Sequence, residues 1–185
     1  MMKYKILITI LLSINLLQAK EGVPFIHSFG ELRVYYKDWL VVCQDKGEGE
    51  CRMVNYLNQN NQPTGFFPNS RLSIVPMQGS NQMVLDFYQH NALSTIEGIT
   101  IELGEKRFDF NSSDYKTPDE TRMMETYILH HQSKLSSLIE HSKKARWLVF
   151  SYHYAQNQAQ SVTFSLLGFS KALEFIYTQK AHNFR

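Results

Sequence analysis

Residues 38–57 read Asp38-Trp39-Leu40-Val41-Val42-Cys43-Gln44-Asp45-Lys46-Gly47-Glu48-Gly49-Glu50-Cys51-Arg52-Met53-Val54-Asn55-Tyr56-Leu57. Two runs rich in Val, Leu and aromatic residues, 39–44 and 51–57, enclose a polar segment with two glycines, and this pattern predicts a β-hairpin. Side chains alternate between the faces of a strand, so Trp39, Val41 and Cys43 share one face. Opposed strands next to a turn bring side chains within disulfide reach, and Cys43 and Cys51 flank this turn.

Cys43 and Cys51 are the only cysteines of the chain. In an exported protein an even count suggests a disulfide, which here would contribute about 2.5 kcal/mol by closing a short loop. Zinc would need about four ligands, and no His or Cys pair elsewhere completes such a pattern. A catalytic dithiol usually has the spacing C-x-x-C, whereas the segment 44–50 separates these two. We therefore expect a structural disulfide, provided that the chain is exported.

The N-terminus predicts export. Residues 1–5 are basic, 6–17 form an apolar run, and Leu17-Gln18-Ala19 is a small-residue cleavage site, the three parts of a signal peptide. The apolar run is shorter than the roughly 20 residues that a membrane-spanning helix needs. We expect residues 1–19 to be removed, leaving a periplasmic or outer-membrane-associated product, 20–185, with no stable transmembrane anchor. A buried N-terminal core helix is the alternative.

The charge balance argues against two classes of partner. The chain has 19 Lys and Arg and 17 Asp and Glu, and cleavage after Ala19 removes Lys3 and Lys5, so the mature product is formally neutral. Nucleic acid and anionic membranes both reward a clustered basic surface. We expect neither as the partner.

The rest of the chain predicts a mainly β domain. A helical period appears at 133–143 and again at 170–177, where Phe169, Ala172, Leu173 and Ile176 recur at helical spacing. Polar, turn-rich segments at 58–69 and 111–119 read as loops. Strand-like runs occupy 31–36, 71–76, 83–88, 99–103, 106–110, 125–129, 146–154 and 161–166. The expected fold is a single β-sandwich-like domain, residues 20–185, with two short helices, one of them C-terminal.

Two segments near the ends of this domain carry a family resemblance. Asp38-Trp39-Leu40-Val41-Val42-Cys43, followed by Cys51-Arg52-Met53-Val54, resembles the opening D-W-x-V-x-C…C of the invasion-associated locus B family of exported bacterial proteins. Ser165-Leu166-Leu167-Gly168-Phe169-Ser170-Lys171-Ala172-Leu173 resembles the closing S-L-x-G-F-x-x-A-L of that family. The resemblance covers residues 36–177. We expect structural roles for Trp39 as a core aromatic, Gly168 in a close-packed turn and Phe169 as a helix anchor.

The chain departs from the family at one position. Members commonly carry a second cysteine pair after a strand resembling 106–110, where this chain has Asn111-Ser112-Ser113-Asp114. The loop 111–119 must therefore be held without a staple. The resemblance implies a β-sandwich-type envelope protein linked by family name to host-cell invasion, and it supplies no enzymatic mechanism.

No pattern of catalytic or metal-binding residues stands out. Adjacent His130 and His131 point in different directions on a helix or strand, and His141 has only Glu140 as a nearby carboxylate. The sequence has no G-x-S-x-G elbow and no glycine-rich phosphate loop. We expect a protein that is not an enzyme, without a cofactor or metal.

Aromatic residues are the best candidates for partner binding. Phe66 and Phe67 lie in a loop with Pro63, Gly65 and Pro68, and they are the expected exposed anchors. In 147–154, alternation separates Trp147, Val149, Ser151 and His153 from Leu148, Phe150, Tyr152 and Tyr154. One reading buries one face in the core and places the other under a helix. The other reading leaves an exposed aromatic patch for a protein or glycan.

We therefore expect a non-enzymatic exported envelope protein that binds an envelope or host protein and has a possible link to host-cell invasion. A periplasmic enzyme or metal-binding protein is one alternative. A chaperone-like carrier of exported chains is another, and an exposed, unpaired strand edge would distinguish it.

Overall fold

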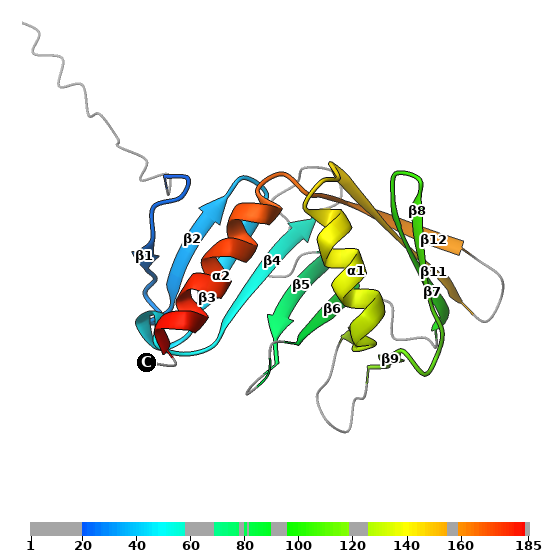
Figure 1. Cartoon of the computed structure of the whole chain (residues 1–185), viewed down its shortest axis with the longest axis horizontal. Helices are drawn as coiled ribbons and strands as arrows, with labels where there is room; N and C mark the ends of the chain where they lie inside the picture. Colours follow the sequence, from blue (N-terminus) through cyan, green and yellow to red (C-terminus); the bar gives the residue numbers. More distant parts are fainter. Residues whose placement is uncertain are drawn as a thin grey trace, which may run out of the picture.

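The computed structural model describes residues 20–57, 69–77, 80, 82–89, 96–118, 126–154 and 159–183. The predicted signal peptide, residues 1–19, and the predicted anchors Phe66 and Phe67 lie outside these ranges. In chain order the elements are β1 (Phe25–Ile26), β2 (Leu32–Tyr36), β3 (Trp39–Cys43), the 3-10 turn η1 (Asp45–Gly47), β4 (Cys51–Leu57), β5 (Ser70–Pro76), β6 (Met83–Gln89), β7 (Ile96–Leu103), β8 (Lys106–Phe110), β9 (Tyr115–Lys116), β10 (Tyr127–Leu129), α1 (Gln132–Ser142), β11 (Trp147–Tyr154), β12 (Ala159–Ser165) and α2 (Phe169–Asn183) (Figure 1).

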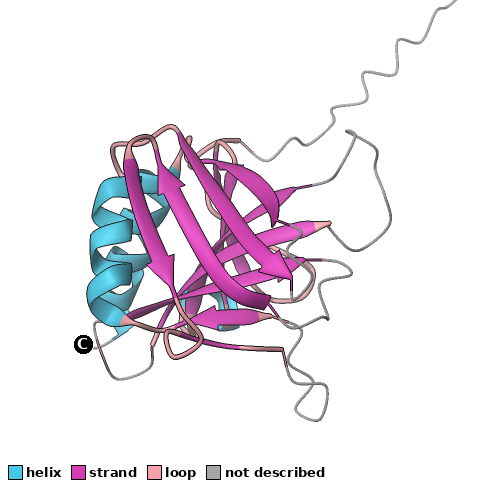
Figure 2. Cartoon of the chain, turned by 90° about the vertical axis from the view of Figure 1, so that its right-hand side faces the viewer, coloured by secondary structure: helices cyan, strands magenta, loops and turns pink. Residues whose placement is uncertain are grey.

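The described strands form two antiparallel sheets. The larger has the order β1-β2-β3-β4-β5-β6-β10-β9 and the smaller the order β12-β11-β7-β8. Both helices lie on the same side of the larger sheet, with α2 against β2, β3 and β4 and α1 against β6 (Figures 1 and 2). The prediction of a mainly β, sandwich-like fold with two helices, one of them C-terminal, is confirmed.

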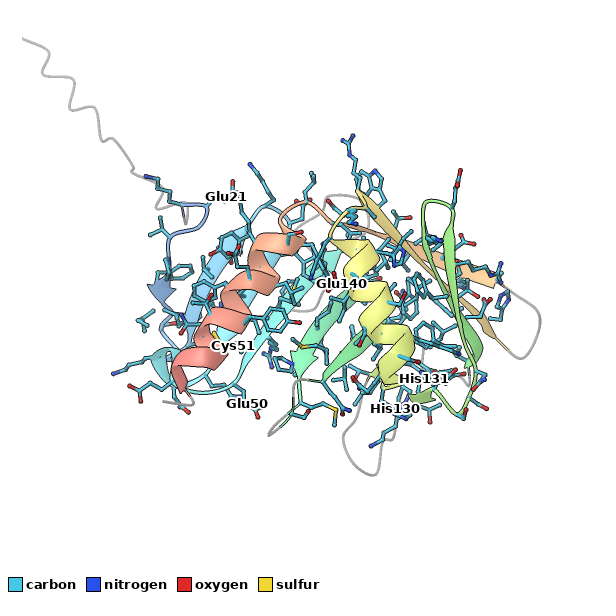
Figure 3. The ribbon with its side chains drawn as sticks, in the orientation of Figure 1. Glu21, Glu50, Cys51, His130, His131 and Glu140 are labelled. Atoms are coloured by element: carbon cyan, nitrogen blue, oxygen red, sulfur yellow. A yellow bond between two sulfur atoms is a disulfide. The ribbon has the colours of Figure 1, made fainter. Side chains whose placement is uncertain are left out.

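The hairpin around the cysteines has the predicted register. Val41 lies opposite Met53, and Cys43 opposite Cys51, whose sulfur atoms are joined by a disulfide. All five residues of β3 are buried, so this strand sits in the interior rather than on one wet face. Figure 3 shows Cys51 on the side of the sheet where α2 packs.

The two segments that carried the resemblance contact each other. The indole N–H of Trp39, a residue with no exposed surface, donates to the carbonyl oxygen of Ser165 at 3.0 Å, and its ring meets Phe169 edge-on with centroids 5.2 Å apart. Between them Gly168 has φ +89° and lies against the backbone of Tyr36. The expected roles of core aromatic, close-packed turn and helix anchor are therefore observed.

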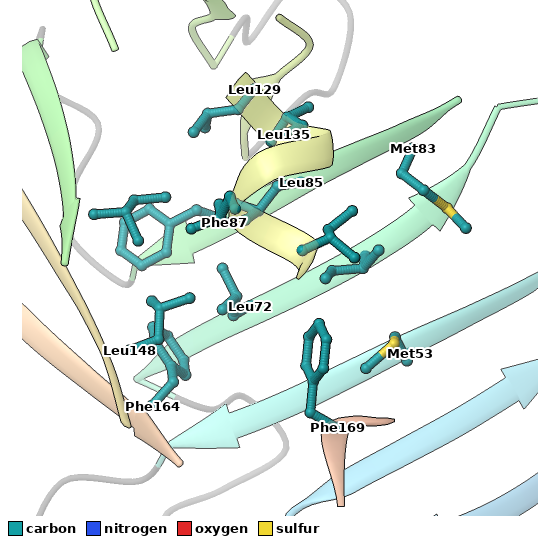
Figure 4. Close-up of a cluster of buried hydrophobic side chains, with 14 of the residues drawn as sticks. Met53, Leu72, Met83, Leu85, Phe87, Leu129, Leu135, Leu148, Phe164 and Phe169 are labelled. Atoms are coloured by element: carbon teal, nitrogen blue, oxygen red, sulfur yellow. The ribbon is translucent and has the colours of Figure 1, made fainter. Parts of the chain in front are cut away.

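The core lies where the two sheets and the helices meet. Phe87 of β6 stacks on Phe150 of β11 with ring centroids 3.9 Å apart, and Phe164 of β12 meets Phe87 edge-on. Leu135 of α1 and Phe169 of α2 belong to the same buried cluster (Figure 4). Each large apolar side chain buried in this way contributes about 1.5–3 kcal/mol.

Some local predictions were incomplete. The segment 111–119, expected to be a loop, contains the two-residue strand β9, which pairs with β10. Residues 25–26 pair with β2 as the short strand β1, and α2 runs on to Asn183 rather than ending near 177. Each addition depends on a neighbouring segment, which local periodicity does not reveal.

Candidate functional site

The outer face of the smaller sheet carries an exposed tryptophan, Trp147. Leu148, Phe150 and Tyr152 of β11 point into the core and are buried, whereas Trp147 on the opposite face is 48% exposed. Both helices lie to one side of this sheet when it faces the viewer (Figure 2). The reading that placed the second face of β11 under a helix is wrong, because α1 and α2 pack on the larger sheet instead.

A hollow of about 580 Å³ opens at one end of this face. It lies between the turn that joins β7 to β8, the end of α1 that carries Glu140 (Figure 3) and the start of β11. Much of its wall is apolar, and Trp147 stands at its edge. The lining residues are Glu102, Leu103, Gly104, His141, Lys144, Ala145, Arg146, Trp147 and Val149.

Two cationic residues line the hollow, and one of them lies close to the exposed indole. The guanidinium of Arg146 lies 5.7 Å from the ring centre of Trp147, within range of a cation–π contact. Lys144 follows the end of α1, where a positive charge is favoured by the helix dipole. The hollow is also lined by Glu102, whose carboxylate lies 3.8 Å from the guanidinium of Arg107. With that carboxylate paired, an apolar hollow edged by an aromatic ring and two cations suits an acidic partner segment that also carries an apolar side chain.

A network of polar side chains links the neighbouring strands β7 and β8 on the same face. The hydroxyl of Thr100 donates to Asp109 at 2.7 Å, and the side chain of Arg107 donates to Asp109 at 2.9 Å while lying 3.8 Å from Glu102. The hydrogen bond from Thr100, assisted by Arg107 and by the charge of Lys134, lowers the pKa of Asp109 despite its partial desolvation. The carboxylate is thus held ionised and occupied within the protein.

His141 is the histidine of the hollow. Its Nδ1 donates to the carbonyl oxygen of Ser137 at 2.8 Å, and its ring meets Phe108 at 5.8 Å. These two contacts fix the orientation of the imidazole ring. Within the described ranges no group of three or more His, Cys, Asp or Glu side chains is placed to hold a metal ion.

The loop that lacks the second cysteine pair is held by a buried carboxylate. Asp114, 3% exposed, accepts hydrogen bonds from the backbone N–H of Asn111 at 2.9 Å and from Nζ of Lys134 at 2.7 Å, and His131 lies 3.8 Å away (Figure 3). Burial raises the pKa of Asp114, but the hydrogen bonds from Lys134 and Asn111 and the nearby positive charges outweigh it and hold the pKa below its ordinary value. An ion pair to α1 thus ties down this loop.

The sequence anticipated part of this site. The disulfide predicted between Cys43 and Cys51 is present, with the Cα atoms 3.9 Å apart. The hollow was not predicted, although Lys143-Lys144-Ala145-Arg146-Trp147 places cations directly before an aromatic residue. That arrangement becomes a site only because the turn between β7 and β8 lies beside it.

Comparison with solved structures shows a likeness in fold. The crystal structure of invasion associated protein B from Bartonella henselae superposes with a TM-score of 0.61, covering 80% of this chain and 98% of that chain at 12% sequence identity. The chain has the fold of that protein. No protein-family model matches the sequence, and a search of the curated proteins finds no match.

The shared fold agrees with the family resemblance that residues 38–54 and 165–173 carry. Both segments belong to one packed unit here, in which Trp39 and Phe169 touch. A disulfide buried between β3 and β4 is compatible with an exported protein, since such bonds persist in oxidising compartments. In the described part of the chain, no helix combines the length and apolar character needed to cross a membrane.

Proposed function

We propose that this chain is a non-enzymatic exported protein of the bacterial envelope that binds another protein through the outer face of its smaller sheet. The fold shared with an invasion associated protein, and the disulfide, support export and a role in contact between bacterium and host cell. The signal-peptide pattern of residues 1–19 supports the same compartment.

Trp147 is the observation that carries the proposal. A tryptophan is costly to leave in water, and this one is 48% exposed beside an apolar hollow on a face that neither described helix covers. Trp and Arg are the residue types most enriched among those that dominate binding energy in protein interfaces, and Arg146 lies beside this indole. The flanking polar network gives the polar rim that such interfaces have.

Site-specific photo-crosslinking in the native bacterium tests the proposal. A benzophenone amino acid in place of Trp147 should capture one protein of defined mass in the envelope fraction. The same substitution at Tyr177 of α2, which is 45% exposed, is the control and should not capture it. With the purified partner, Trp147→Ala should weaken binding about 30-fold or more, as loss of a dominant interface residue does, whereas Tyr177→Ala should change it little.

Two results would contradict the proposal. One is a protein that stays in the cytosol at full length, with residues 1–19 attached and two free thiols. The other is equal capture from positions 147 and 177, which would show that the outer face has no special affinity for a partner.

A further inference from the structure

In the described structure the smaller sheet ends at β12, and no other described strand pairs with the outer edge of β12. Of the four strands that end the two sheets in the described structure, β1 and β9 have only two residues each, and β8 carries three charged residues, Lys106, Arg107 and Asp109. Shortness and charge are the usual ways in which proteins protect a sheet edge. The sequence of β12, Ala159-Gln160-Ser161-Val162-Thr163-Phe164-Ser165, has neither a charged residue nor a proline.

The hydrogen-bond pattern shows which backbone groups face outward. The N–H of Leu166 donates to the carbonyl oxygen of Arg146 at 2.9 Å, just beyond the pair formed by Ser165 and Trp147. In an antiparallel pair, hydrogen-bonded and non-hydrogen-bonded positions alternate. Every second residue of β12, counting back from Ser165, therefore turns its N–H and C=O away from β11: Ser165, Thr163, Ser161 and Ala159.

Of these four residues, only Ser165 has a hydrogen-bond partner for its outward backbone groups within the described structure. The carbonyl oxygen of Ser165 accepts from the indole of Trp39 at 3.0 Å and from the side-chain amide of Asn55 at 2.9 Å. Among the described residues no strand pairs with Thr163, Ser161 and Ala159, and all three are exposed. Two backbone groups on each of three residues give about six donors and acceptors in strand spacing.

We propose that this edge binds an extended segment of a partner polypeptide, which adds to the smaller sheet as a fifth strand. Alternating donors and acceptors along a strand are complementary to another extended backbone. The proposal rests on the proposed function, because it names the kind of segment that the same sheet receives. An unpaired strand edge is also the feature expected of a chaperone-like carrier of exported chains, the alternative that the sequence raised. Asn55 and Trp39 close one end, so the paired stretch covers about five residues, 159–163.

The side chains of β12 define the partner segment further. Val162 is partly buried against the core and points inward, whereas Ser161 and Thr163 are exposed on the outer face. A residue beside Val162 would extend the core and should be apolar, and its neighbours beside Ser161 and Thr163 should be polar. The segment therefore alternates apolar and polar residues.

A second copy of the chain fits this edge less well. Antiparallel pairing centred on Ser161 would place Gln160 of one copy beside Val162 of the other, where an apolar residue is wanted. Pairing centred on Val162 would place Ala159 of one copy opposite Ser165 of the other, whose carbonyl oxygen already accepts from Trp39 and Asn55, so only Ser161 and Thr163 could pair. A partner segment meets neither obstacle.

The test uses the mature protein and a soluble peptide of alternating Val and Thr flanked by glutamates. The peptide should bind, and at saturation the amide protons of Ser161 and Thr163 should exchange with solvent about tenfold more slowly. A peptide of the same composition with Val and Thr in blocks should bind more weakly. Thr163→Pro should weaken binding about tenfold or more, because proline removes an outward N–H but none of the bonds to β11. Thr163→Val, which keeps the N–H, is the matched control.

The outcomes separate the inference from the proposed function. Ser161→Pro repeats the test if Thr163→Pro lowers stability. Absence of peptide binding, unchanged binding by both proline variants, or a dimer in sedimentation that both proline variants abolish would overturn the inference. Failure of crosslinking at Trp147 would overturn the proposed function while leaving peptide binding at the edge intact.

Discussion

Replacing Gly168 with alanine should destabilise the protein more than any other Gly→Ala change at a described position. Gly168 has φ +89°, and a Cβ there would lie 2.5 Å from the carbonyl carbon of Tyr36, closer still to its oxygen, and 3.2 Å from Cβ of Lys37. The first two contacts are backbone atoms of the β2–β3 turn, which cannot rotate away as a side chain can. The turn or the start of α2 must therefore move.

The expected cost has two parts. A non-glycine residue in this region of φ costs about 1–3 kcal/mol, and forcing extra volume into a packed site costs about 1–3 kcal/mol more. We expect Gly168→Ala to lower the free energy of unfolding by about 2–6 kcal/mol. For a chain of this size that lowers Tm by about 4–24 °C.

Two other glycines separate the backbone cost from the cost of the added volume. Gly104, in the turn between β7 and β8, has φ +60°, and a Cβ there would have no other atom within 4 Å, so Gly104→Ala reports the backbone cost alone. Gly98 has open space and no positive φ, so Gly98→Ala should change stability by about 0.5 kcal/mol or less. Urea unfolding of the three mature variants gives the free energies. If Gly168→Ala costs no more than Gly104→Ala, the argument from the Tyr36 contact is refuted.

Two further predictions concern the disulfide and the loop 111–119. Replacing both Cys43 and Cys51 with alanine should lower the free energy of unfolding by about 2.5 kcal/mol. A reducing agent should shift the urea midpoint of the wild type but not that of the variant. Equal midpoints of wild type and variant without reductant would contradict this prediction. Because the folded pKa of Asp114 is below its ordinary value of about 3.9, its contribution is present above that pH and is lost as pH falls toward the folded pKa. Asp114→Asn should therefore give a shallower loss of stability on acidification from about pH 5, measured by urea midpoints, and an unchanged slope would show that the ion pair to Lys134 does not hold the loop.

Much of the candidate site could not be predicted, for a reason that individual residues illustrate. Alternation in 147–154 predicted which residues of β11 share a face. It did not predict which face is exposed, because that depends on the packing of Phe150 against Phe87 of the other sheet. Trp147 lies in a hollow because residues 102–104, more than 40 positions earlier, form its opposite wall. The residues next to Asp114 in the sequence do not indicate that it is buried. Its burial depends on Lys134, which is 20 positions away in the chain and 2.7 Å away in the structure.

The amino-acid sequence by itself determined the mainly β character, the hairpin that the disulfide joins, and both helices. These features follow from period-two and helical patterns and from turn residues within about ten positions of one another. Only the tertiary structure decided that β10 lies between β6 and β9, that Gly168 touches Tyr36, and that β12 is an end strand of its sheet among the described strands. Such pairings join segments far apart in the chain, and they are selected by packing of the shared core rather than by local periodicity.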